Sequence, residues 1–348
     1  MMARNQTVFS ELCIARNLTH DKSLESVHGV QHQDKLQFYT EEQKRLATAS
    51  GRSSVGVLEE TSKAIHTFLS TQGLLNQSVH WLGKHTTEAG MTVAKDIQVA
   101  DWRISVKENA HVFINGSTLT VFEDIPMGGL GRKRHGSDWF STVAAEAYQD
   151  YFYACQRYTQ GFSSHASVQD FYARTSKQER KAFSVAVAEL HKKPSHDISE
   201  LSSLYLTFCH QVSQQSAQYF NHRLAYASTG HPQEKLMSVL YHYFFKLNGS
   251  KYILAGSDHK KPFAVLVPSS SEWQTNYMLH DVKAIPKYSG QPEVILRFFL
   301  QDLVTQELFE LDLKVEVRWS HGKFCGNPEA KVYKQWLYSD LPWVTSLL

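Results

Sequence analysis

One short stretch of the chain, DIQVADWRISVK, begins with the acid Asp96 and ends with the amine Lys107. If Ala100 and Asp101 form a two-residue turn, antiparallel pairing sets Asp96 opposite Ser105 and leaves Lys107 on the same face. Directly opposed side chains lie roughly 5 Å apart, and diagonal ones about 7–8 Å. The carboxylate of Asp96 and the ammonium of Lys107 could therefore reach one phosphate group.

Such a pair fits phosphodiester hydrolysis, which needs a divalent ion to polarise the phosphate and to lower the pKa of the attacking water. Oxygen ligands hold Mg²⁺, and an ammonium group beside it orients the nucleophile or offsets the charge that develops. In this interpretation Asp96 binds Mg²⁺ and Lys107 is the catalytic cation. The alternative is an ordinary half-exposed hairpin with solvated charges, because the pattern is short.

An Asp on a strand, followed about ten residues later by a residue-x-Lys triplet, resembles the PD-(D/E)xK nuclease core. The triplet Ser105-Val106-Lys107 is similar to the SxK form found in some restriction endonucleases. Two positions depart from the core pattern, since Lys95 stands where a proline is typical and Ser105 replaces an acid. The resemblance therefore implies that a second acid comes from elsewhere in the chain.

Three glutamates are candidates for that second acid. Glu59 and Glu60 lie on the helix expected before the hairpin and are similar to the N-terminal helix glutamate of many such nucleases, while Glu123 lies downstream. The resemblance implies a metal site of Asp96 with one of these acids, and we take Glu60 as the first candidate. The sequence does not choose among the three.

A second stretch also satisfies the short catalytic pattern. Asp302 is followed by Asp312-Leu313-Lys314, which reads as D-x(9)-DxK. We rank this set second because only 34 residues follow Lys314, which leaves little chain to complete a core around it.

The C-terminal third carries a longer motif. Val315–Lys331 resembles the pattern R-x-S-x-G-x-F-x-G-x-PEAK found near the end of several restriction endonucleases. Arginine can read guanine bidentately and lysine can hold a phosphate. The resemblance implies DNA contacts at four positions of this chain: Arg318, Ser320, Lys323 and Lys331. The alternative is a solvent-facing strand with cross-strand ion pairs.

A glycine-rich basic loop, PMGGLGRKRHG, precedes the next predicted helix. Its cations Arg132, Lys133 and Arg134 could lie along a phosphate backbone. The loop is not a P-loop, because GK[ST] is missing.

The elements expected to position these residues follow from periodicity. Residues 1–50 are polar and weakly periodic, and Ala47–Ser54 reads as a turn. Helices are expected at Val55–Leu69, from Ser137 or Asp138 to Tyr158, after a capping box of Ser176 with Glu179, over Ile198–Tyr226, and from Pro232 through Phe245. Period-two patterns predict strands within Val93–Lys107 and at Tyr252–Leu254, Phe263–Val267, Val294–Leu300 and Leu308–Trp319.

The expected fold class is α/β, mixed α+β, with a restriction-endonuclease-like core. We expect residues 1–50 to be an N-terminal extension and residues 51–160 to be the PD-(D/E)xK-like core. Residues 161–250 would then form a helical region, and residues 251–348 a β-rich DNA-recognition region.

Composition sets outer limits on function. Of 348 residues 42% are hydrophobic, and 36 Lys plus Arg face 34 Asp plus Glu, so a protein that coats DNA by charge alone is disfavoured. The four cysteines form no CxxC pair, which argues against a zinc site or a disulfide framework. The absence of a long apolar run predicts a soluble cytoplasmic protein.

Together these features predict a Mg²⁺-dependent type II site-specific deoxyribonuclease that leaves a 5′-phosphate. The resemblance implies a homodimer acting on double-stranded palindromic DNA, with a companion methyltransferase that protects the host. The alternative is a nucleic-acid-binding protein without cleavage, in a defence or mobile-element complex.

Overall fold

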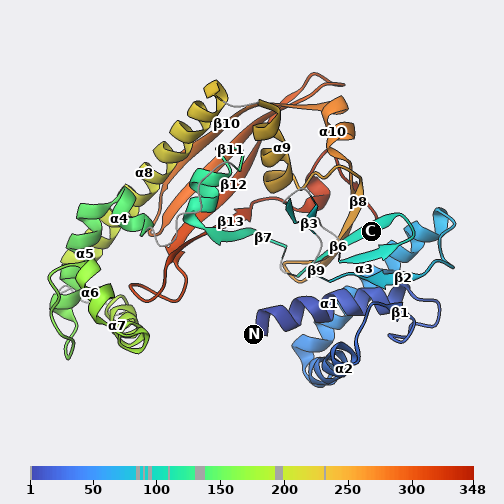
Figure 1. The fold of residues 1–348 in the computed structure, drawn as a ribbon, viewed down its shortest axis with the longest axis horizontal. Helices are drawn as coiled ribbons and strands as arrows, with labels where there is room; N and C mark the ends of the chain where they lie inside the picture. The colour runs from blue at the N-terminus through green and yellow to red at the C-terminus, as the bar shows by residue number, and fades with distance from the viewer. Residues whose placement is uncertain are drawn as a thin grey trace. The chain divides into compact units, whose positions relative to one another are not determined.

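The computed structural model describes residues 2–83, 87–88, 91–92, 96–108, 110–129, 138–192, 199–230 and 233–348 (Figure 1). The chain forms two compact units. Unit 1 comprises Met1–His111, Lys246–Asn276 and Trp336–Leu348, and unit 2 comprises Val112–Phe245 and Tyr277–Gln335. This division differs from the expected four consecutive regions, because each unit combines segments that lie far apart in the sequence.

Unit 1 is built on a seven-stranded mixed sheet of order β1-β2-β5-β6-β8-β9-β14. Its strands are β1 (Val27–His28), β2 (Val79–Trp81), β5 (Ile97–Val99), β6 (Trp102–Lys107), β8 (Tyr252–Asp258), β9 (Lys261–Val267) and β14 (Thr345–Ser346). Strands β6 and β8 pair in parallel, so residues far apart in sequence, such as Ser105 and Leu254, lie side by side.

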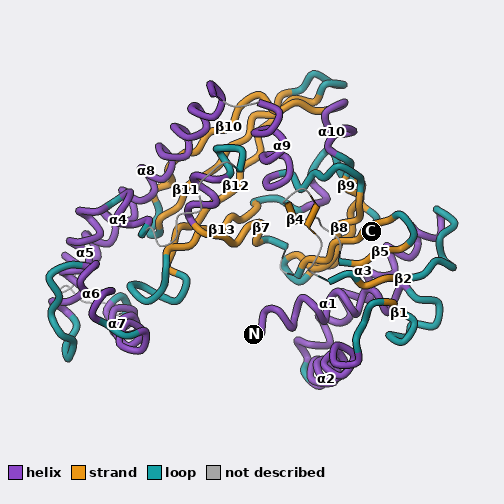
Figure 2. Tube along the Cα trace, in the orientation of Figure 1, coloured by secondary structure: helices purple, strands orange, loops and turns teal. Residues whose placement is uncertain are grey.

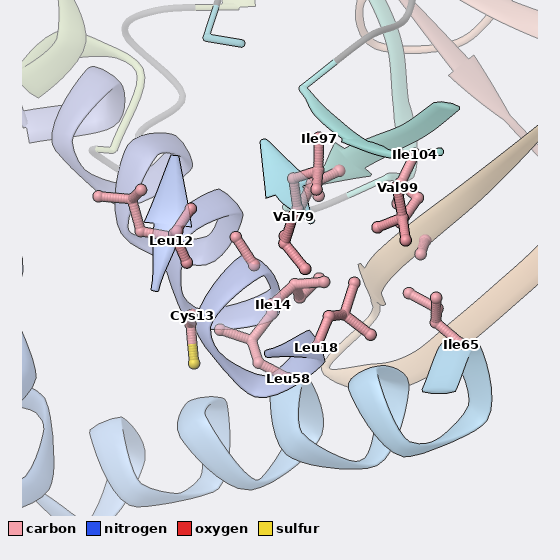
Figure 3. Close-up of a cluster of buried hydrophobic side chains, with 14 of the residues drawn as sticks. Leu12, Cys13, Ile14, Leu18, Leu58, Ile65, Val79, Ile97, Val99 and Ile104 are labelled. Atoms are coloured by element: carbon pink, nitrogen blue, oxygen red, sulfur yellow. The ribbon is translucent and has the colours of Figure 1, made fainter. Parts of the chain in front are cut away.

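Helices α1 (Met2–Leu18) and α3 (Ala49–Thr71) cover one face of this sheet, and α2 (His32–Ala47) packs on these two helices. Figure 3 shows their apolar side chains, including Leu12, Ile14, Leu58 and Ile65, gathered with Ile97 and other strand residues. Smaller elements of unit 1 are β3 (Thr87–Glu88), β4 (Met91–Thr92), α10 (Ser270–Asn276) and the 3₁₀ turn η3 (Tyr338–Asp340). The opposite face of β5 and β6 carries the alternate side chains of these two strands.

The expectation of an N-terminal extension is corrected by helix α1. Phe9, Leu12 and Ile14 are buried in the core of unit 1, so this segment belongs to the sheet-and-helix layer. The expected turn at Ala47–Ser54 is also shorter than predicted, since α3 already begins at Ala49 after the cap residue Thr48.

Unit 2 contains a five-stranded antiparallel sheet of order β10-β11-β12-β13-β7. Its strands are β7 (Val112–Ser117), β10 (Tyr277–Tyr288), β11 (Pro292–Asp302), β12 (Leu308–Trp319) and β13 (Pro328–Lys334). The long helix α8 (Ser199–Gly230) runs beside β10 and β11, as the purple helix and orange strands of Figure 2 show. Asn221 joins the two layers, because its side-chain amide exchanges hydrogen bonds of 2.8 Å with the backbone of Ala284.

The remaining helices of unit 2 are η1 (Thr120–Asp124), α4 (Trp139–Val143), α5 (Ala145–Tyr158), α6 (Val168–Arg174), α7 (Lys177–Leu190) and α9 (Gln233–Phe244). The predicted capping box is confirmed, with Ser176 and Glu179 bonded reciprocally at the start of α7. Asp138 caps the helix that was predicted to run to Tyr158. That helix is interrupted at Ala144, where φ is −150°, so the segment forms the two helices α4 and α5. No helix among the described residues is long and apolar enough to cross a membrane.

Candidate functional site

Strands β5 and β6 form the predicted hairpin, joined by the two-residue turn Ala100-Asp101. The turn residue Ala100 has a φ of 49°, in the left-handed region that tight hairpin turns require. The Cα partners agree with the predicted register: Ile97 with Ile104, Gln98 with Arg103 and Val99 with Trp102. The register ends at the pair of Ile97 and Ile104. The predicted pairing of Asp96 with Ser105 is not formed by the backbone, because the Asp96 N–H donates to the Ile104 carbonyl at 3.0 Å.

The side chain of Asp96 is held in a defined orientation by two donors on β6. Its Oδ2 accepts hydrogen bonds from the Ser105 hydroxyl at 3.1 Å and from the Val106 backbone N–H at 2.6 Å. The side chain is almost buried, with the residue 8% exposed. Because a carboxylate offers about four acceptor positions, these two donors leave capacity for a cation.

Lys107 lies two residues beyond Ser105 on β6, so strand alternation puts both on the same face. Lys107 is exposed, and its Cα partner on the parallel strand β8 is Gly256. Gly256 has a φ of 140°, and a Cβ there would overlap the backbone carbonyl oxygen of Lys107. The close approach of β6 to β8 beside Lys107 therefore depends on a glycine.

A second lysine, which sequence reasoning missed, lies near Lys107. Burial, together with the positive charge of Lys107, lowers the pKa of Lys246 to about 7. The backbone carbonyl of Lys246 accepts a hydrogen bond of 2.8 Å from the Tyr252 hydroxyl. Burial and the negative charge of Asp96 in turn raise the pKa of Tyr252. Lys246 and Tyr252 thus link electrostatically to both predicted catalytic residues.

The two helix acids are exposed on α3. This helix packs through Leu58 and Ile65 against the face that carries Ile97, opposite to the face of Ser105. Glu59 lines a separate cavity of about 430 Å³ together with Arg16, Asn17, Lys22, Ser62, Lys63, His66 and Thr67. The described contacts of Glu59 and Glu60 therefore do not bring either one to Asp96.

A different helix carries a buried acid close to the hairpin. Glu11 on α1 is 1% exposed, and its Oε2 accepts a hydrogen bond of 2.9 Å from the Trp81 indole N–H. Trp81 is the Cα partner of Ile97, the first residue of β5, and the backbone carbonyl of Asp96 accepts from the N–H of Leu82. Trp81 and Ile97 share the face that α1 covers, so Glu11 lies on the opposite side of the sheet from Ser105.

Glu123 belongs to unit 2, where it contacts α8. Its carboxylate accepts from the Tyr219 hydroxyl at 3.2 Å and pairs with Arg223 at 3.5 Å. These partners, both on α8, account for the charge of Glu123 within unit 2.

The second catalytic pattern is not gathered into one site. The Asp302 carboxylate accepts from the backbone N–H groups of Val304 and Thr305 in its own turn. Asp312 is bonded bidentately by Arg297, at 2.8 and 2.9 Å, and Lys314 pairs with Glu293 at 3.0 Å. Each of the three residues thus has a local structural partner.

The polar face of β12 and β13 carries two of the predicted DNA contacts. Arg318 pairs with Glu329 at 3.0 Å, and Lys331 lies 4.0 Å from the same carboxylate. Ser320 follows β12, where its backbone N–H donates to the Asn327 carbonyl. Arg318 therefore forms a cross-strand ion pair, as the alternative interpretation of the motif expects, while Lys331 approaches the same carboxylate from its own strand, β13.

Lys323 lies in a mainly aromatic environment. Its ammonium sits 4.4 Å from the centroid of the Tyr205 ring, and burial lowers its pKa. The next residue, Phe324, is fully buried and stacks on Tyr148 and Tyr151. This part of the motif anchors the β12–β13 loop in the core of unit 2.

The three cations of the basic loop lie outside the described residues: Arg132, Lys133 and Arg134. The described chain leads into it through Gly128 and Gly129, which have φ values of 64° and 74°. Both backbones lie in the left-handed region that favours glycine.

Comparison of the chain with models of known families, with curated proteins and with solved structures finds no match. Any assignment of function therefore rests on the geometry of Asp96, Ser105 and Lys107 and on the chemistry of the groups around them.

Proposed function

We propose that the chain is a Mg²⁺-dependent endonuclease that cuts double-stranded DNA at specific sites, with its active site at the β5–β6 hairpin. The observation that carries the proposal is the carboxylate of Asp96, fixed by the Ser105 hydroxyl and the Val106 amide on the strand face of Lys107. A fixed carboxylate can hold a metal ion, and an exposed ammonium beside it can offset the negative charge of a phosphodiester.

The residues present fit Mg²⁺, because Asp96 retains acceptor capacity and Mg²⁺ takes few carboxylates together with waters and substrate phosphate. When bound, the ion polarises the phosphate and lowers the pKa of the attacking water. Asp96 would hold the ion, and Ser105 would position Asp96. Lys107 would orient the water or offset negative charge on the phosphate, and cleavage would leave a 5′-phosphate.

The proposal assigns no helix acid to the ion. Glu11 on α1, like Glu59 and Glu60 on α3, belongs to a helix that packs on the face of Ile97, opposite to the face of Ser105. In this proposal Asp96 holds the ion together with waters and the substrate phosphate.

Unit 2 would contribute DNA recognition through the polar face of β12 and β13. Arg318 and Lys331 share the carboxylate of Glu329 in the free chain, and DNA phosphates or base edges would compete for them. We further propose a homodimer acting on a palindromic site in the cytoplasm, with a methyltransferase of the same specificity as its genetic partner.

Digestion of a plasmid and a phage genome of known sequence tests the function. In Mg²⁺ we expect discrete fragments whose mapped ends share one short sequence and carry 5′-phosphates, and chelation should abolish cutting. Retention of both DNAs on the protein, with no cleavage in Mg²⁺ or Mn²⁺, would instead support a binding protein without nuclease activity.

A further inference from the structure

Three potential metal ligands meet at the end of β8, apart from the hairpin acids. Asp258 is the last residue of β8, and His259 occupies the turn into β9 with a φ of 48°. His111 follows β6, and it is brought to this place by the hydrogen bond from the Ala110 N–H to the Ser257 carbonyl, at 3.0 Å. Two chain segments far apart in sequence thus converge here within unit 1.

The three side chains lie close enough to share an ion. One ligand atom from each residue falls within 4.8 Å of the other two. The rings of His111 and His259 are 5.0 Å apart at their centroids and inclined by 25°. In a site with bonds of about 2.0–2.2 Å, neighbouring donors lie roughly 3–3.5 Å apart. A small rotation of the exposed His259 would close that difference.

Charge and burial favour a cation at this position. Asp258 is 3% exposed, so its carboxylate is largely removed from water. His259 Nε2 is 3.9 Å from Asp258 Oδ1, which is longer than a hydrogen bond. A divalent ion between the two atoms would lie directly beside the buried carboxylate.

The donor set indicates the class of metal. Two imidazole nitrogens and one carboxylate oxygen suit Zn²⁺ and other late first-row dications, whereas Mg²⁺ prefers oxygen ligands. The position also differs from that of Asp96, since β6 lies between β5 and β8 and Asp258 is two residues beyond the partner of Lys107. By strand spacing, the Cα atoms of Asp96 and Asp258 are on the order of 15 Å apart.

We propose that His111, Asp258 and His259 form a second metal site, which takes Zn²⁺ or a similar dication and fastens the segment after β6 to the β8–β9 hairpin. The site is structural, because it ties two chain segments together at the end of the sheet. It does not depend on the proposed nuclease activity.

Zn²⁺ titration of the untagged full chain by calorimetry, with Co²⁺ absorption as a second probe, tests the site. His259→Asn keeps a residue that tolerates positive φ and removes one ligand. The matched control is His28→Asn, because His28 stacks on His80 at 4.8 Å but belongs to no three-ligand group among the described residues.

We expect one equivalent of Zn²⁺ to bind wild type and the His28 variant alike and to raise their unfolding midpoints. His259→Asn and His111→Gln should each weaken that binding at least tenfold, as loss of a metal ligand does. Equal Zn²⁺ affinity in wild type and both ligand variants, or no binding to wild type, would overturn the site. Mg²⁺-dependent cutting by His259→Asn is expected to persist, which separates this outcome from the nuclease test.

Discussion

Glu11 tests which face of the sheet carries the site. We predict that Glu11→Gln, which keeps an acceptor for Trp81, cuts DNA at the wild-type rate in saturating Mg²⁺, because α1 packs on the face opposite to Ser105. Glu60→Gln, which removes an exposed acid from α3, should behave in the same way. Loss of cutting in a folded Glu11 or Glu60 variant would instead assign the second acid to that helix.

Lys246 should make stability depend on pH. Its pKa in the folded chain is about 7, below the ordinary value of 10.5, so between these pH values the unfolded chain binds more protons. Stability therefore rises from pH 7 toward 10.5, and the cost of burying the ammonium is fully present below pH 7.

We expect Lys246→Met to remove this component. Between pH 7 and 10 the unfolding midpoint of wild type should therefore rise by at least about 5 °C more than that of the variant. Lys63→Met, at an exposed position on α3, is the control. Thermal unfolding from pH 6 to 10 measures the effect. Parallel pH curves for wild type and Lys246→Met would contradict the assignment.

Among single residues, the sequence was most informative where spacing alone fixes geometry. The contact between Asp96 and Ser105 follows from a two-residue turn, because that turn leaves only one register. Lys246 could not be found in this way, since it comes near Lys107 only through tertiary packing.

At the scale of elements, the pairing of β6 with β8 depends on Gly256. We predict that Gly256→Ala destabilises unit 1 by about 3 kcal/mol or more, because the new methyl group meets the Lys107 carbonyl and the backbone φ is strained. Gly249→Ala is the control, as nothing lies within 4 Å of a Cβ there. Similar denaturant midpoints for both variants would contradict this account of the close approach.

Phe324 tests whether the C-terminal motif is partly structural. We expect Phe324→Ala to cost about 3–5 kcal/mol in denaturant unfolding, because the ring is buried against Tyr148 and Tyr151. Leu308→Ala, at a residue that is 73% exposed, should change stability little. If Phe324→Ala unfolds like wild type and instead loses DNA affinity, the motif acts at the DNA.

Elements with one apolar face were predictable, and those with several were not. The hairpin strands, the capping box before α7 and the alternation of β12 were all predicted and are confirmed. Helix α1 was missed because Phe9, Leu12, Cys13 and Ile14 are buried in succession, which blurs the helical period.

At the scale of the molecule, the mixed α/β class was predictable, but the division into units was not. Unit 1 draws β8, β9 and the C-terminal segment back to the N-terminal helices, and local periodicity carries no information on such returns. The net charge of +2 shows that any affinity for DNA must come from local arrangement, such as the paired cations of β12 and β13.

The central claim is that Asp96 and Lys107 form a hydrolytic site, and single-turnover cleavage of one mapped DNA site tests it most directly. Asp96→Asn and Lys107→Ala should each slow cutting at least about a hundredfold in Mg²⁺ while DNA binding persists. Asp101→Asn, at the exposed tip of the same hairpin, should cut like wild type. Wild-type rates in the Asp96 and Lys107 variants would contradict the account.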